Sequence, residues 1–139
     1  MWLGSTATAG STTVLPGFSS PSGNIRCFVV RSSTLPALLI CSLEHANYAK
    51  RLQARCMGPS GGGVDWHGFT LRASGRGTIN CTGGILYNPT TQRPSTARLA
   101  YGKRWQAGPF TCWSRVIGVT CRNRVGHGLS VSRQAWRLW

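Results

Sequence analysis

The segment Gly108-Pro-Phe-Thr-Cys-Trp-Ser-Arg-Val-Ile-Gly-Val-Thr-Cys121 decides the fold class of this chain. Each of its two cysteines lies in a stretch where apolar and polar residues alternate. A period of two is typical of β-strands and directs Val119 and Cys121 to the same face of a sheet. A turn near Val116–Gly118 then brings Cys112 opposite them. The segment therefore predicts a β-hairpin whose register a Cys112–Cys121 disulfide would lock.

The composition extends this prediction to the whole chain. Its 139 residues are enough for one domain with a hydrophobic core. The 18 glycines and 7 prolines, with Ser, Thr, Val and Ile in short runs, favour many strands joined by turns over long helices. No apolar run approaches the roughly 20 residues that a membrane-spanning helix needs. We therefore predict an all-β protein, a single antiparallel domain folded as a sandwich or small barrel.

The pattern along the chain predicts where the main elements lie. A first strand begins at Ile25, and the apolar run Leu35–Leu43 returns beside it. A short basic helix is expected over Glu44–Cys56. The strand Val64–Leu71 changes the parity of its apolar residues halfway, as a β-bulge does. Residues 83–98 show little periodicity and predict a long surface connection.

The cysteines predict a disulfide-bonded protein. There are 6 of them, an even number, and none forms a Cys-x-x-Cys pair, so zinc ribbons and redox dithiols are poor interpretations. An exported protein with three disulfides is the better one, and we expect a secreted, periplasmic or cell-surface location. Strand logic favours pairing between nearest neighbours, which gives Cys27–Cys41, Cys56–Cys81 and Cys112–Cys121.

The first 17 residues differ in character from the rest. Ala7-Thr-Ala9 fits the small-x-small pattern of a signal-peptide cleavage site, although the positive and apolar regions that should precede it are absent. We interpret residues 1–17 as the tail of a signal peptide followed by a flexible lead-in over 10–17. The disulfide-bonded β domain is then expected to span residues 18–139.

The charge balance points to anionic partners. Lys and Arg number 16 against 2 acidic residues, which gives a net charge of +14. A field of that size attracts nucleic acids, acidic glycans or cell-wall polymers. Of the basic residues, 14 are Arg, whose planar fork matches phosphate and carboxylate groups. The same excess of Arg over Lys also arises when a genome favours GC-rich codons, so composition alone leaves both explanations open.

Several motifs together resemble a family of small secreted or lipid-anchored bacterial proteins defined only as a domain of unknown function. They are Phe18–Cys27, Cys56 with Asp65–Gly68, Leu99–Gly102, Gly108–Cys112, Gly118–Asn123 and Gly126–Arg133. This chain departs from the family pattern in its basic Arg122 and Arg124 and in Leu129, where the family is aromatic. The resemblance implies an exported, disulfide-bonded β domain and implies no activity.

Three residues are weak catalytic candidates. His127 lies between two glycines, which permit close approach of a ligand or a tight turn. Asp65 and His67 share one face of an extended strand. A small ribonuclease-like hydrolase would use His127 and His67 as base and acid, with Lys103 on the phosphate. Paired carboxylates, a Gly-x-Ser-x-Gly elbow and metal-ligand spacing are all missing, so we expect no metal or cofactor and favour a non-enzymatic module.

Tryptophan and arginine are interleaved in the last third of the chain. Exposed aromatic rings beside guanidinium groups stack on bases or sugars while the cation binds an anion. Most of the tryptophans are expected in the core, and Trp113 is the expected exception because it alternates with Cys112. A protein partner remains the alternative to an anionic polymer. The expected binding residues are Arg104, Trp113, Arg115, Arg122, Asn123, Arg124, His127 and Arg133.

Overall fold

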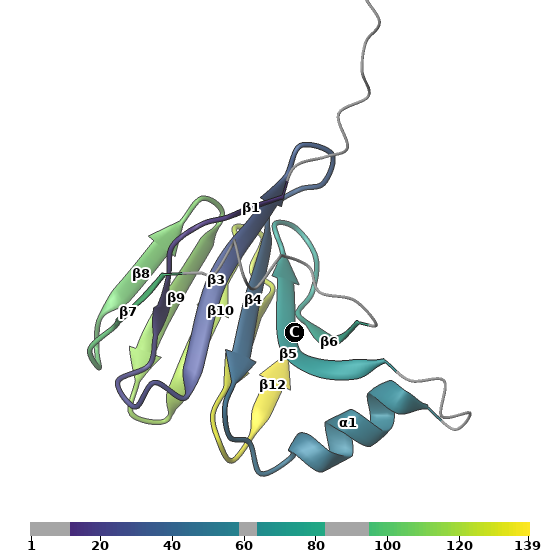
Figure 1. Cartoon of the computed structure of the whole chain (residues 1–139). Coiled ribbons are helices and arrows are strands. Elements are labelled where there is room, and N and C mark those ends of the chain that lie inside the picture. Colours follow the sequence, from purple (N-terminus) through teal and green to yellow (C-terminus); the bar gives the residue numbers. More distant parts are fainter. Residues whose placement is uncertain (1–11, 59–63, 83–94) are drawn as a thin grey trace, which may run out of the picture.

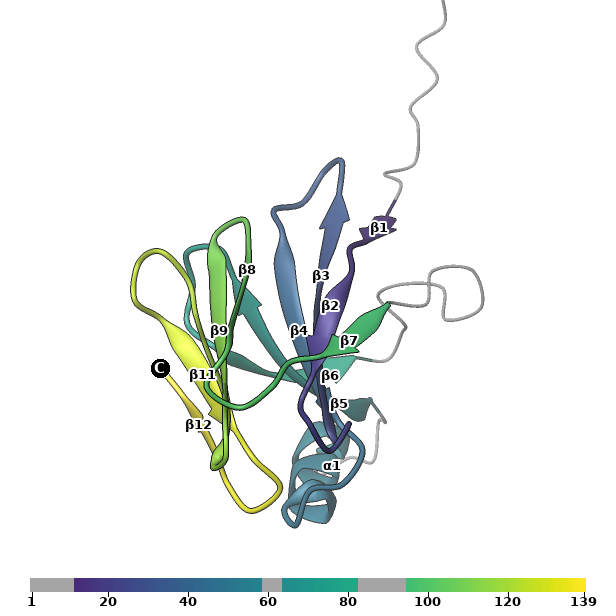
Figure 2. The same cartoon turned by 90° about the vertical axis from the view of Figure 1, so that its left-hand side faces the viewer.

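A computed structural model describes residues 12–58, 64–82 and 95–139. Two β-sheets pack face to face as a sandwich, and one helix lies at an end of it (Figure 1; Figure 2). The predicted all-β fold is therefore confirmed in its sandwich form. Within the described ranges, no helix has the length and apolar character that crossing a membrane requires.

The larger sheet, sheet A, has seven strands in the order β6-β5-β4-β3-β2-β7, and β1 also pairs with β3. Its strands are antiparallel except for β2 and β7, which run parallel. Their bounds are β1 Thr12–Val14, β2 Gly17–Ser19, β3 Ile25–Ser32, β4 Leu38–Leu43, β5 Asp65–Arg72, β6 Thr78–Thr82 and β7 Thr96–Arg98. The predicted bulge is present in β5, where the register with β6 shifts between Trp66 and Phe69.

The smaller sheet, sheet B, is an antiparallel meander of five strands in the order β12-β11-β10-β9-β8. The strands are β8 Arg104–Ala107, β9 Phe110–Arg115, β10 Gly118–Arg122, β11 Gly128–Val131 and β12 Trp136–Leu138. The β9–β10 hairpin is the one that the opening segment predicts, with Cys112 opposite Cys121 and a turn at Val116 and Ile117.

The core lies between the two sheets, and two disulfides meet in it. Cys27–Cys41 joins β3 to β4 and Cys112–Cys121 joins β9 to β10, and all four residues are fully buried. The sulfur atoms of Cys27, Cys41 and Cys121 lie within 4.8 Å of one another. The disulfide of one sheet therefore packs on the disulfide of the other, in the centre of a single apolar cluster to which both sheets contribute.

The helix α1, Ala49–Met57, is attached by the third disulfide. Its buried residues Leu52 and Cys56 are one turn apart, and Cys56 is bonded to Cys81 of β6. All three nearest-neighbour pairings are thus confirmed. The helix begins five residues later than the predicted Glu44, because the preceding backbone is bound elsewhere. The amides of Glu44 and His45 donate to Asn24, and that of Asn47 donates to the Arg133 carbonyl.

Two sequence expectations differ from the structure. The described part of the expected lead-in is ordered into β1, which pairs with β3, and the start of β2. The expected connection over 83–98 contains β7 at its end, while residues 83–94 lie outside the described residues. The strands β1 and β7 have only three residues each, which is too short to show an alternation of apolar and polar residues in the sequence. They are strands because they pair with β3 and β2, which are distant in the sequence.

Candidate functional site

The outer face of sheet B carries a continuous row of polar and aromatic side chains. Register partners share a face, so the pairings across the five strands bring five residues into line. The row reads Arg104, Trp113, Thr120, Ser130 and Arg137. Because neighbouring strands are about 4.8 Å apart, the row extends about 19 Å. Arg115 and Arg122 flank it on β9 and β10, and we call this surface the open face.

The arginines of the open face are exposed and have no Asp or Glu side chain paired with them. Arg104, Arg115, Arg122 and Arg137 are all exposed to solvent. The chain has only two acidic residues, Glu44 and Asp65. Glu44 pairs with Arg26 at 3.2 Å, and Asp65 accepts a hydrogen bond from Gln53 at 2.8 Å. The open face is consequently a field of uncompensated positive charge, interrupted by one half-buried indole, Trp113.

Trp139 forms one edge of this face. Its ring lies 5.9 Å from the Arg122 guanidinium and 5.2 Å from the Arg137 guanidinium, both at cation–π distance. A side chain at position 128 would place its Cβ 2.8 Å from the indole, so only glycine allows this packing. The ring nitrogen donates to the Gly126 carbonyl at 3.0 Å. Gly126 and Gly128 of the Gly-His-Gly motif therefore hold the Trp139 ring in place.

The turn between β10 and β11 is held by Asn123. Its side-chain oxygen accepts hydrogen bonds from the amides of Val125 and His127, at 3.2 and 3.1 Å. Its side-chain nitrogen donates to the carbonyl of Arg72, at the end of β5, at 2.9 Å and to that of Gly75, in the β5–β6 connection, at 2.8 Å. Asn123 is buried, and both ends of its amide are occupied. It shapes the turn, which leaves Arg124 exposed at the tip.

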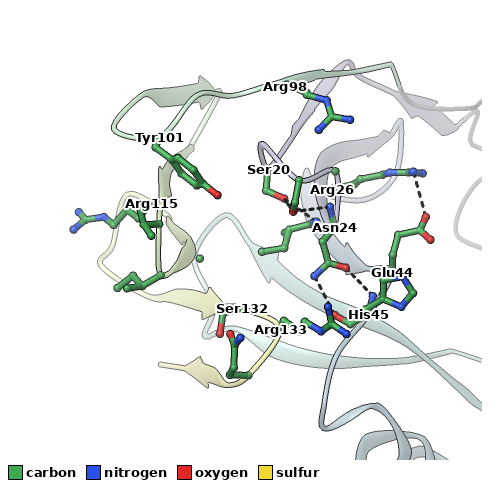
Figure 3. A pocket seen from close by; sticks show the side chains of 17 residues that line it. Ser20, Asn24, Arg26, Glu44, His45, Arg98, Tyr101, Arg115, Ser132 and Arg133 are labelled. Carbon is green, nitrogen blue, oxygen red and sulfur yellow. Dashed lines mark hydrogen bonds and ion pairs between the residues drawn. The ribbon is translucent and has the colours of Figure 1, made fainter.

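A cleft of about 690 Å³ opens at the end of the sandwich where the β2–β3, β9–β10 and β11–β12 turns meet (Figure 3). Arg26, Arg98, Arg115 and Arg133 all line it, and so does Tyr101. In Figure 3 the Arg98 guanidinium and the Tyr101 hydroxyl point into the cleft, whereas the Arg115 guanidinium points away. The cleft is thus a second basic site, formed by segments from both sheets.

The wall of the cleft is fixed by the turn from Ser20 to Asn24. The Ser20 hydroxyl accepts a hydrogen bond from the Ile25 amide at 3.0 Å. Asn24 makes two bonds to His45, accepting from its amide at 2.7 Å and donating to its carbonyl at 3.0 Å. Arg98 donates to the Pro21 carbonyl, which holds its guanidinium at the rim. The basic groups therefore project from a preorganised backbone.

The opposite wall is tied to the interior through Tyr48. Its hydroxyl donates to the Ser132 carbonyl at 2.7 Å, and the residue is 2% exposed. Burial disfavours the tyrosinate and raises the pKa of Tyr48 to about 12. At neutral pH the hydroxyl therefore stays protonated and keeps this link between the β4–α1 connection and the β11–β12 turn.

The structure separates the predicted binding residues into three groups. Arg104, Trp113, Arg115 and Arg122 lie together on the open face. Asn123, Arg124 and His127 lie in the β10–β11 turn beside it. Arg133 lines the cleft instead. Trp113 occupies the face opposite Cys112, as predicted, whereas Trp66, Trp105 and Trp136 pack against the core.

Four contributors lie outside the residues predicted from the sequence: Arg137 and Trp139 on the open face, and Arg98 and Tyr101 in the cleft. The alternation of β12, which places Arg137 on the same face as Ser130, could have identified the first of these. Arg98 and Tyr101 depend on the parallel pairing of β7 with β2, for which no local pattern exists.

The weak catalytic candidates are not brought together. Asp65 and His67 are near the start of β5, whereas Asn123, in the turn that contains His127, contacts Arg72 at its end. The five residue steps from His67 to Arg72 correspond to roughly 17 Å of strand. In the described ranges, the one cluster of three His, Cys, Asp or Glu at metal-ligand spacing is Cys27, Cys41 and Cys121, whose sulfurs are bonded in disulfides.

Fold and site together define a small, basic, disulfide-bonded β-sandwich with one open sheet face and one cleft. The chain belongs to a family of unknown function, DUF6636, whose model matches residues 1–139. No curated protein matches the chain. No solved structure matches it either. Function must therefore be argued from the surfaces themselves.

Proposed function

We propose that this protein is an exported, non-enzymatic binding module whose open face contacts an anionic polymer. The observation that carries the proposal is the row of register partners from Arg104 through Trp113 to Arg137, which contains no Asp or Glu. A β-sandwich requires nothing of its outer face except solubility, and alternating acidic and basic residues would provide that. Here every charged side chain of the row and its flanks is an arginine, which favours a polyanion as the partner.

The chemistry of the row fits a linear ligand with regularly spaced charges. Each guanidinium can donate two parallel hydrogen bonds to a phosphate, sulfate or carboxylate group. The Trp113 ring offers an apolar platform for a base or sugar between the charged ends. The hydroxyls of Thr120 and Ser130 lie 3.2 Å apart in the middle of the row and can exchange their mutual hydrogen bond for one to the ligand.

Export is part of the proposal because of the three disulfides. Bridges of this kind persist in oxidising compartments and are rare in a reducing cytosol. A secreted, periplasmic or cell-surface protein of this charge meets acidic glycans, cell-wall polymers and released nucleic acid. His67 lies near the start of β5, whereas the turn that contains His127 contacts the end of that strand. This separation argues against a ribonuclease-like hydrolase, since its acid and base must both reach one phosphate.

The test is a binding and cleavage assay in the same tubes. The oxidised protein is incubated with labelled RNA, DNA and an acidic glycan over a series of salt concentrations. We expect salt-sensitive binding without cleavage. Replacing both row ends, Arg104→Gln with Arg137→Gln, should weaken binding about tenfold and lower the slope of log K against log salt by about 1.5. The matched control, Lys50→Gln with Arg51→Gln on α1, removes the same charge elsewhere.

Three outcomes would contradict the proposal. The first is an equal effect of the control pair, which would mean that net charge alone attracts the polymer. The second is an absence of binding to all three polymers at moderate salt. The third is cleavage that is lost in His127→Ala while the fold is kept, which would favour the hydrolase. The binding module should tolerate His127→Ala with its affinity unchanged.

A further inference from the structure

The tip of the β9–β10 hairpin exposes two large aliphatic side chains. Val116 is 81% exposed and Ile117 is 78% exposed, in a two-residue turn between the paired Arg115 and Gly118. Turns of this length favour Asn, Asp and Gly because of their backbone geometry. Two β-branched residues suit neither the turn nor the water around them, and they contribute nothing to the core. The fold does not explain them.

These side chains belong to an apolar patch at the mouth of the cleft. Tyr101, 51% exposed, lines the cleft together with Val116 and Ile117. The other large exposed hydrophobic residues of the described chain are Leu35 and Val125, each alone in a different turn. Single exposed apolar residues are ordinary on protein surfaces. Three of them around one opening, two at a projecting tip, are not.

Cationic groups surround this patch. Arg98 and Arg133 line the cleft, and Arg115 adjoins the tip. The one carboxylate that lines it, Glu44, is occupied by Arg26 at 3.2 Å. Figure 3 shows Arg98 directed into the cleft from one side and the Tyr101 hydroxyl from another. Exposed aliphatic groups, a tyrosine and several arginines around one opening match the chemistry of an anionic membrane surface.

We propose that this end of the sandwich docks on a bilayer that contains anionic phospholipid. Val116 and Ile117 enter the boundary between headgroups and acyl chains, and Tyr101 lies at headgroup level. Arg98 and Arg133 contact a headgroup phosphate in the cleft. The inference goes beyond the proposed polymer binding, because it involves a different end of the molecule and a different ligand. Docked this way, the strands of sheet B stand upright on the membrane.

The experiment is co-sedimentation of the oxidised protein with two kinds of vesicle. One is pure phosphatidylcholine, and the other is phosphatidylcholine mixed with phosphatidylglycerol. We expect binding to the anionic vesicles and little to the neutral ones. The double substitution Val116→Ser with Ile117→Ser should lower partitioning at least about tenfold, since two buried aliphatic side chains are lost. Arg133→Gln should lower it about fivefold.

The matched control removes exposed apolar side chains from other turns. Leu35→Ser with Val125→Ser should leave vesicle binding unchanged. The tip variant retains every charge, so its binding to RNA or acidic glycan should equal that of the natural sequence, and each proposal can fail without the other. The docking proposal is overturned if anionic vesicles are not bound, if the tip variant binds them as well as the natural sequence does, or if the tip substitutions only dissociate a dimer in gel filtration.

Discussion

The outer faces of the two sheets differ although their inner faces are alike. Both inner faces supply apolar side chains and a disulfide to one core. The outer face of sheet A then carries a second apolar cluster, in which Phe28, Val30 and Ile40 are 3%, 8% and 4% exposed. The outer face of sheet B carries the arginine row, and none of the row's residues is buried. One outer face therefore contributes to stability, and the other is free to bind.

The alternation of the strands is what allows this division. In β3 the inward residues Cys27 and Val29 alternate with the outward Phe28 and Val30, so the strand is apolar on both sides. In β9 the inward Phe110 and Cys112 alternate with the outward Thr111 and Trp113. Since side chains on opposite faces do not touch, the outward positions of β9 can change without disturbing the core.

The largest effect is expected from Phe28→Ala on the outer face of sheet A. Removal of a nearly fully buried aromatic ring should lower the free energy of unfolding by about 3–5 kcal/mol. Urea unfolding followed by circular dichroism measures the loss. Polymer binding by the folded fraction should not change. A loss below about 1 kcal/mol would mean that this cluster is not part of the stabilising structure and would remove the contrast between the faces.

The next effect concerns Tyr48, in the interior between the two faces. Its folded pKa of about 12 is above the ordinary value of 10.0, so the fold favours the protonated hydroxyl. The contribution to stability is complete below pH 10 and is lost as the pH rises toward 12, by about 2 kcal/mol. Unfolding in urea across this range measures it. Tyr48→Phe should be less stable at neutral pH and should lose this part of the pH dependence, and an unchanged slope would contradict the assignment.

A smaller effect is expected from Trp113→Ala on the open face. Loss of the aromatic platform should weaken binding of RNA about tenfold, which corresponds to one stacked base. The free energy of unfolding should fall by about 1 kcal/mol or less, because the ring is only half-buried. Fluorescence titration and urea unfolding give the two numbers. A stability loss as large as that of Phe28→Ala would show that the open face is structural after all.

The smallest effect is expected in the middle of the row. Thr120→Val keeps the shape of the side chain and removes its hydrogen bond with Ser130. We expect stability to change by less than about 0.5 kcal/mol and binding of RNA by about twofold. The same two measurements apply. A tenfold loss of binding would mean that the hydroxyls, rather than the arginines, determine recognition.

The sequence predicted the parts of the fold that depend on local patterns. The hairpin around Cys112 and Cys121 follows from a period of two and a short separation, and so does the outward position of Trp113. The start of α1 was not predictable in this way, because Asn24, some twenty residues earlier, binds the backbone at His45. The helix propensity of the residues around Glu44 gives no information about a contact with a residue so far away in the sequence.

The candidate site was predictable to the same extent. The outward position of Arg122 follows from its place next to the inward Cys121, whereas the position of Arg104 depends on the register of β8 with β9. The cleft could not be predicted, since its walls come from turns of both sheets and from Arg98, which a parallel pairing of β7 with β2 places there. Asn123 resembled a binding residue because the sequence does not show whether a side-chain amide is exposed or, as here, buried and hydrogen-bonded.

Because two disulfides meet in the core, the rate at which a reductant cleaves them reports how often the two sheets separate. Cys27, Cys41, Cys112 and Cys121 have 0% exposure, so a reductant in solution has no path to their sulfurs while the sheets are in contact. Cys56–Cys81 joins α1 to the edge strand β6, where Cys56 is 8% exposed and Cys81 is half-buried, so this bond is more accessible than the other two. Each interior bond reduced would record one separation of the two sheets, on the slow timescale on which native proteins transiently expose their centres.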